Sequence, residues 1–148
     1  MLIRLLCIAA FSLNLLAADP FLGTWKLNLA ESRFPSGNTP RSMTVVWSKD
    51  GDGDGVKVAT TGVGADGSPI RSEYMAVYNG KETPNRGPWN WDIVINRQVS
   101  EREREDVFKK AGKVEGTSKL KVSENGARLT VEFEYRGVRS VRVYDRQE

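Results

Sequence analysis

The segment KDGDGDGVKV, residues 49 to 58, carries carboxylates at the alternate positions Asp50, Asp52 and Asp54. A calcium-binding EF-hand loop begins with this spacing because alternate carboxylate oxygens can surround the ion. The EF-hand loop also needs a bidentate carboxylate at its twelfth position, which is Thr61 here, and a helix on each side. The flanking runs SMTVVWS and VKVATTGV are typical of strands. We therefore predict an acidic turn and no dedicated metal site, with weak calcium binding by the three aspartates as the alternative.

The segment SEREREDVF places Arg102, Arg104, Asp106 and Phe108 at alternate positions, and glutamates occupy most of the positions between them. Side chains two residues apart on a strand share a face, so an inward Phe108 would bring both arginines into the interior. A buried cation is costly unless an anion offsets it, so such an interior would suit an anionic amphiphile. The alternative is the outer end of a long strand with solvent on both faces.

The C-terminal run EYRGVRSVRVYD admits two hairpin registers. A two-residue turn at Arg136-Gly137 places Arg142 and Tyr144 on the same inward face as Phe133. A three-residue turn, with the glycine in the left-handed conformation, would turn the neighbouring valines inward instead. The first register gives an interior guanidinium and phenol that could hold an acidic head group; the second gives an ordinary apolar strand.

Trp89 and Trp91 in RGPWNWDIVI share one face with Ile93 and Ile95 if the alternation of a strand begins there. Aromatic side chains at this spacing cover one end of a barrel or fill its core. Lining the mouth of a ligand cavity is the alternative.

Histidine is absent from the sequence. Its absence removes the commonest general base, the usual zinc ligand and every Ser-His or Cys-His nucleophile pair. We therefore expect a protein that is not an enzyme and has no cofactor, with a carboxylate-dependent hydrolase or isomerase as a remaining alternative. The net charge is only +3 and basic residues alternate with acidic ones, so we expect no nucleic-acid partner.

The first eighteen residues have the composition of a secretory signal peptide. Arg4 is followed by an apolar run through Leu16, and the small residues Ala17 and Ala18 precede Asp19. The apolar run is short for a membrane span, which needs about 20 residues. We predict a signal peptide at 1–18 and a monomeric domain at 19–148, secreted or periplasmic, with no membrane span in the mature chain.

The elements that position these residues are predicted to be strands, because turn signals recur every eight to twelve residues after residue 20. Asn125-Gly126 favours a two-residue hairpin that pairs Leu120 with Val131 and Val122 with Leu129. Tight hairpins between neighbours indicate an all-β, up-and-down antiparallel barrel of about eight to ten strands. The predicted strands lie near residues 23–29, 42–48, 56–63, 70–78, 81–84, 90–96, 101–110, 113–123, 128–135 and 138–145.

Both ends of this domain resemble the calycins, the group of lipocalin and fatty-acid-binding-protein barrels. DPFLGTWKLN resembles their first strand, which carries G-x-W, here Gly23 and Trp25. The resemblance implies that Trp25 closes one end of the barrel. RGVRSVRVYDR resembles the last hairpin of the fatty-acid-binding proteins, and this implies that Arg142 and Tyr144 point into a cavity and hold a ligand carboxylate.

The sequence departs from the fatty-acid-binding proteins in two respects. Their two lid helices have no counterpart, because AESRFPSGNTPRS is too short and holds two prolines. Their second cavity arginine would fall near Leu120. The opening GTWKLN also resembles secreted bacterial lipocalin-like proteins. We expect an exported barrel that binds a small hydrophobic or amphiphilic ligand, anionic ones included. The alternative is a barrel filled by its own side chains that acts in cell-envelope interactions. The candidate ligand-binding residues are Arg142, Tyr144, Arg102, Arg104, Phe108 and Phe133.

Overall fold

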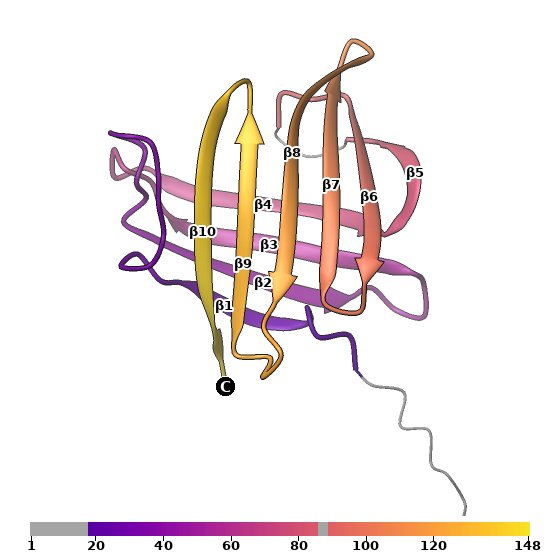
Figure 1. Cartoon of the computed structure of the whole chain (residues 1–148), viewed down its shortest axis with the longest axis horizontal. Coiled ribbons are helices and arrows are strands. Elements are labelled where there is room, and N and C mark those ends of the chain that lie inside the picture. Colours follow the sequence, from indigo (N-terminus) through magenta and orange to yellow (C-terminus); the bar gives the residue numbers. More distant parts are fainter. Residues whose placement is uncertain (1–17, 86–88) are drawn as a thin grey trace, which may run out of the picture.

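The computed structural model describes residues 18–85 and 89–148, and the predicted signal peptide therefore lies almost wholly outside the described residues. Ten strands and no helix make up the described part of the chain (Figure 1). The strands are β1 Gly23–Leu27, β2 Ser42–Lys49, β3 Gly55–Val63, β4 Pro69–Val77, β5 Asn79–Pro84, β6 Ile93–Ser100, β7 Glu103–Lys110, β8 Lys113–Val122, β9 Arg128–Tyr135 and β10 Val138–Gln147. The ten strands predicted from the turn signals are all present.

The strands form one antiparallel sheet in the order β4-β3-β2-β1-β10-β9-β8-β7-β6-β5. The first and last strands pair with each other, and this joins the two halves of the meander. Strands β4 and β5 are the two edges, so the barrel is nearly closed, with its seam between these strands. In Figure 1 the layer of β1 to β4 crosses behind the layer of β6 to β10 at a large angle. The prediction of an all-β, up-and-down antiparallel barrel is confirmed.

Two hairpin turns set the registers as their residues predict. Across Asn125-Gly126, Leu120 pairs with Val131 and Val122 with Leu129. Across the second turn, Tyr135 pairs with Val138, as in the two-residue alternative. Arg136 and Gly137 have φ angles of 50° and 78°, as a two-residue turn that matches strand twist requires. The inward register for Arg142 is therefore the correct one.

The acidic segment forms the connection between β2 and β3. Asp50, Asp52 and Asp54 are all exposed there, and Gly51 has a positive φ of 60°. The flanking residues Lys49 and Val56 pair across the two strands, so the segment is a hairpin connection. Within residues 18–85 and 89–148, no group of three or more His, Cys, Asp or Glu side chains could hold a metal ion.

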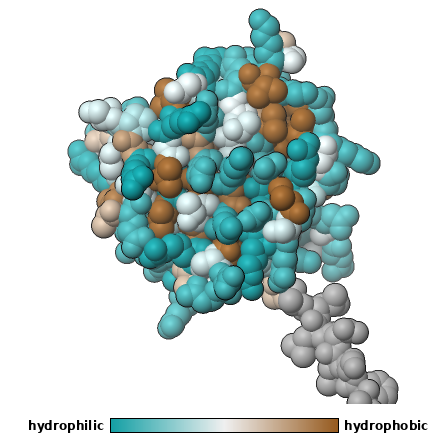
Figure 2. Space-filling model, in the orientation of Figure 1, coloured by the Kyte–Doolittle hydropathy of each residue, from teal (hydrophilic) through white to brown (hydrophobic). Residues whose placement is uncertain are grey.

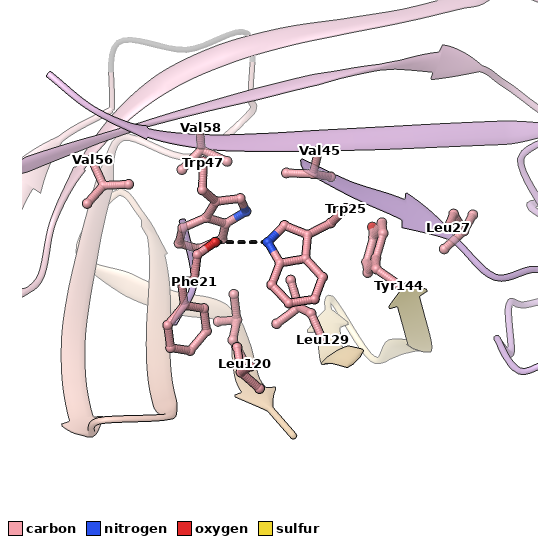
Figure 3. Packing of buried hydrophobic residues seen from close by; sticks show 11 residues of the cluster. Phe21, Trp25, Leu27, Val45, Trp47, Val56, Val58, Leu120, Leu129 and Tyr144 are labelled. Atoms are coloured by element: carbon pink, nitrogen blue, oxygen red, sulfur yellow. Dashed lines mark hydrogen bonds between the residues drawn. The ribbon is translucent and has the colours of Figure 1, made fainter. Parts of the chain in front are cut away.

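Part of the hydrophobic core, including Phe21 and Trp25, lies at the end of the barrel near the start of β1 (Figure 3). Trp25 is fully buried, and its Nε1 donates to the carbonyl oxygen of Phe21 at 2.8 Å. The guanidinium of Arg146 lies 4.1 Å from the centre of the Trp25 ring and donates to the carbonyls of Pro20 and Leu22. These contacts close this end of the barrel.

Gly23 is needed at that closed end for two reasons. Its φ of +126° is one that residues with a side chain rarely adopt, and a Cβ there would lie 2.7 Å from Nη1 of Arg146. The G-x-W pair therefore combines a glycine that lets the arginine approach with a tryptophan that the arginine covers.

A loop covers the opposite end of the barrel. Residues 28–41 connect β1 to β2 without a helix. Backbone hydrogen bonds in both directions join Arg33 to Val141 of β10, at 2.7 and 2.8 Å. The loop is thus fixed to the last strand.

The outer surface is mainly hydrophilic on the face shown in Figure 2, where hydrophobic residues form small separate groups. A search of the described residues for membrane-spanning segments found no helix of the length and apolar character that crossing a bilayer requires.

Candidate ligand-binding cavity

A cavity of about 620 Å³ lies inside the barrel. Its volume falls within the roughly 300–1,000 Å³ that small-molecule sites occupy in proteins. Apolar and aromatic side chains from both layers form most of its wall, among them Val45, Val58, Leu120, Leu129 and Val131. The alternative interpretation of the sequence required an interior filled by the protein's own side chains. The cavity shows that the interior is not filled in this way.

Aromatic side chains form one continuous part of this wall. Trp91 stacks on Trp89 with ring centres 5.3 Å apart and contacts Phe108 at 4.4 Å. Phe108 is followed by Phe133 at 5.8 Å, and Phe133 by Tyr135 at 6.4 Å. Two of the residues predicted to bind ligand, Phe108 and Phe133, are part of this wall.

The two tryptophans precede β6 and do not share its alternation. Val94 and Asn96 are the buried residues of β6 that line the cavity. The face predicted from the tryptophans, with Ile93 and Ile95, is therefore wrong for the strand. The error arises because the strand begins only at Ile93, so counting in steps of two from Trp91 crosses an irregular segment.

Arg142 and Tyr144 of β10 both line the cavity. Nε of Arg142 donates to Oγ of Ser140 at 3.2 Å, and its guanidinium lies 4.7 Å from the centre of the Phe133 ring. No salt bridge joins this arginine to an acidic residue within the described part of the chain. The cavity therefore contains a cation whose charge no carboxylate of the described residues neutralises.

Tyr144 is buried beside that cation. Its hydroxyl donates to Sδ of Met43 at 3.2 Å. Burial raises the pKa of Tyr144, and the nearby positive charge of Arg142 offsets part of this effect. The phenol is therefore a neutral group that can donate a hydrogen bond next to the guanidinium.

The cavity meets a groove of about 480 Å³ at the end covered by the 28–41 loop. Phe34 and Pro35 of the loop line this groove, and Phe34 lies 5.9 Å from the guanidinium of Arg142. Five residues belong to both spaces: Met43, Ile70, Phe133, Tyr135 and Arg142. The groove is thus the mouth of the cavity, and the loop forms one of its sides.

The other two predicted arginines lie elsewhere. Arg104 points inward, but toward the closed end, where its Nη2 donates to Oδ2 of Asp19 at 2.6 Å and its Nε to Gln98 at 2.7 Å. Arg102 precedes β7 and donates to the carbonyl of Ser123 at 3.0 Å. Neither is among the residues that line the cavity. The expected interior with three arginines is therefore not what the structure shows, because each of these two has a partner within the protein.

A polar group that the sequence analysis did not assign to the site interrupts the apolar wall. Nδ2 of Asn96 donates to Oδ1 of Asp106 at 2.6 Å, and Oγ of Ser118 donates to Oδ2 at 2.8 Å. We call these three residues the Asp106 cluster. Burial raises the pKa of Asp106, which the two hydrogen bonds and the charge of Arg104 partly counteract. The alternation of β7 could have placed Asp106 beside Phe108 in the cavity, whereas no local signal identified Asn96.

Comparison with known proteins bears on the fold. No family model matches the sequence, and a search of curated proteins found no match. Among solved structures, the fluorescent protein UnaG superposes with a TM-score of 0.63 at 20% identity, over 86% of this chain and 97% of that one. A fatty-acid-binding protein of Echinococcus granulosus gives 0.62 at 16% identity, over 87% and 98%.

A third solved structure is a Schistosoma mansoni fatty-acid-binding protein in complex with arachidonic acid. It superposes with a TM-score of 0.63 at 16% identity, over 87% of this chain and 97% of that one. Identities this low establish a shared fold and nothing finer. The ten-stranded meander, its nearly closed sheet and its internal cavity therefore give this chain the same fold as the fatty-acid-binding proteins.

Proposed function

We propose that this protein reversibly binds a small hydrophobic molecule with an acidic head group. The observation that carries the proposal is the position of Arg142, whose guanidinium lines an apolar cavity with no carboxylate of the described residues paired to it. Tyr144 adds a neutral hydroxyl beside it. An acidic head would meet both groups while its apolar body occupies the rest of the cavity.

The apolar wall and Arg142 would contribute differently to the free energy of binding. Apolar surface removed from water contributes about 25 cal/mol per Å², so most of the affinity would come from the hydrophobic body. A hydrogen bond to a charged group contributes about 1.5–3 kcal/mol. Arg142 would therefore select the head group and fix its orientation, and the aromatic wall would supply most of the binding free energy.

The names of two solved structures with the same fold support this proposal. Both are fatty-acid-binding proteins, and one of these was solved with arachidonic acid. We infer a binding protein and not an enzyme. A cavity of this size also favours a ligand-binding role over that of a barrel filled by its own side chains.

The test is titration with a fluorescent fatty-acid analogue, followed by displacement with oleic acid. Arg142→Ala should weaken oleic acid binding about tenfold or more, since a lost charge-assisted hydrogen bond corresponds to at least that factor. Arg139→Ala is the matched control, because Arg139 lies on the same strand, is exposed and pairs with Glu134. Equal affinities of the two variants, or no binding by the unmodified protein, would contradict the proposal.

We further propose that the protein is exported and acts in the periplasm or the medium. The support is the pattern of residues 1–18, with Arg4, an apolar run and two alanines before Asp19. The mass and N-terminal sequence of the protein recovered from the cell envelope or the medium test this. Removal of the segment is expected, and full-length protein confined to the cytoplasm would refute export.

A further inference from the structure

The Asp106 cluster is a hydrogen-bonding group built into the apolar wall. Asn96, Asp106 and Ser118 are 1%, 4% and 4% exposed, and all three line the cavity. They lie directly opposite one another on β6, β7 and β8, since Asn96 pairs with Asp106 and Asp106 with Ser118. The cluster is therefore a single row of polar side chains that crosses three strands.

The cluster has unused hydrogen-bonding capacity. Oδ1 of Asn96 is buried and has no hydrogen-bond partner in the described part of the chain. The two oxygens of Asp106 accept one hydrogen bond each, from Asn96 and from Ser118. A carboxylate has about four acceptor positions, so others are free. An unsatisfied buried polar group destabilises the folded state. A hydrogen-bond donor in the cavity would remove this destabilisation.

The same row continues to the site of the acidic head. Ser118 pairs with Phe133 on β9, and Phe133 with Ser140 on β10. Ser140 accepts the hydrogen bond from Arg142. Three strand spacings separate Asp106 from Ser140, which is about 14 Å along the curved wall. Phe133 lies between them, so the cavity has two polar sites separated by an aromatic surface.

A purely structural role explains the cluster poorly. A buried carboxylate is costly, and well-packed apolar residues in its place are often neutral or stabilising. The β6, β7 and β8 strands are already joined by their backbone ladders. The orphaned oxygen of Asn96 adds a further cost that the fold does not require.

We propose that the Asp106 cluster binds a hydroxyl group on the body of the ligand, remote from its acidic head. This inference rests on the proposed function and narrows its ligand class to hydroxylated acidic amphiphiles. A hydroxyl suits the site because it donates to Oδ1 of Asn96 and also accepts from the second hydrogen of Nδ2 of Asn96. Its donor would satisfy the orphaned acceptor that an unsubstituted chain leaves buried.

The ligand-side test compares oleic acid with ricinoleic acid, which differ by one mid-chain hydroxyl. The unmodified protein should bind ricinoleic acid about tenfold more tightly, the factor that corresponds to about 1.4 kcal/mol. Ricinoleic acid methylated on this hydroxyl should return to the affinity of oleic acid, because the donor is gone. Equal affinity for oleic and ricinoleic acids would overturn the inference, and so would undiminished binding of the methylated acid.

The protein-side test uses Asn96→Leu, which removes the unpaired acceptor at similar volume. We expect the preference for ricinoleic acid over oleic acid to disappear. Thr60→Val is the matched control, since Thr60 is a polar residue of the cavity wall outside the cluster, and it should keep the preference. Ser118→Ala, which should reduce the preference, provides a second variant if Asn96→Leu does not fold.

The outcomes separate this inference from the proposed function. If both acids bind equally well to the unmodified protein, the cluster does not recognise a hydroxyl and fatty-acid binding stands. If neither acid binds, the proposed function fails together with the inference that rests on it. A preference that survives in Asn96→Leu would also overturn the assignment to the cluster.

Discussion

Arg104 and Asp19 form an ion pair across the closed end of the barrel, with Nη2 and Oδ2 2.6 Å apart. Arg104 is 5% exposed, and its guanidinium also lies 4.1 Å from the ring centres of Phe21 and Tyr78. The pair joins β7 to the segment before β1, which are 85 residues apart in the sequence. It therefore fixes the N-terminal segment of the domain over the core.

Replacement of Asp19 should destabilise the protein. Asp19→Ala leaves the buried guanidinium without its anion, and we expect a loss of about 2 kcal/mol in the free energy of unfolding. Urea unfolding measures this change. Glu134→Ala is the control, because it breaks the exposed pair with Arg139 and should change the same quantity by less than about 0.5 kcal/mol. Equal losses in the two variants would show that burial of Arg104 does not matter.

Arg146 should also be important for stability. Arg146→Met removes the positive charge over the Trp25 ring and the hydrogen bonds to the carbonyls of Leu22 and Gly126. We expect a loss of about 2 kcal/mol, measured by urea unfolding, because methionine covers the ring but donates no hydrogen bond. Arg139→Met on the exposed face is the control. A variant as stable as the control would refute a structural role for this arginine.

Stability should fall with rising pH through the titration of Asp106. Burial raises its pKa above the ordinary 3.8, so the folded state holds the proton more tightly than the unfolded state. The resulting stabilisation is fully present below the ordinary carboxyl pKa and is lost as the pH rises through the raised pKa. Tyr74 and Tyr78 nearby stay neutral, because burial raises the pKa of both. Urea unfolding from acidic to neutral pH should show this decline, and Asp106→Asn should lack it.

The control for this pH dependence is Asp66, whose pKa is shifted in the opposite direction. Hydrogen bonds from Ser68 lower the pKa of Asp66, so its contribution to stability is present above the ordinary carboxyl pKa and is lost as the pH falls through the lowered one. Asp66→Asn should therefore keep the decline toward neutral pH. A decline of equal size in Asp106→Asn would assign it to other groups.

Filling part of the cavity should weaken binding without unfolding the barrel. Val131 lines the cavity, and Val131→Phe would occupy part of its volume. We expect affinity for oleic acid to fall about tenfold or more, with the free energy of unfolding changed by less than about 1 kcal/mol because the space is already empty. Val46→Phe on the outer face is the control, since Val46 is 39% exposed. Unchanged affinity in Val131→Phe would place the ligand elsewhere.

The strand pattern and the hairpin registers were predictable from the sequence because they depend on neighbouring residues. Asn125-Gly126 fixed one register, and Arg136-Gly137 left two, of which the structure has the one that turns Arg142 inward. The alternation of β7 placed Arg104 and Phe108 on one face, and the structure shows that this face is the buried one. In each case residues within one hairpin decide the outcome.

The positions and partners of these inward side chains could not be predicted from neighbouring residues. Arg104 was expected beside Arg142, but it lies at the closed end and pairs with Asp19. Counting in steps of two from Trp91 placed Asn96 outside, but it belongs to the cavity wall. The sequence by itself determined a ten-stranded meander and left two registers for its last hairpin, one of which turns Arg142 inward. Only the tertiary structure decided which charges are paired and how much empty space the barrel encloses, because those depend on side chains that close the sheet from opposite ends of the chain.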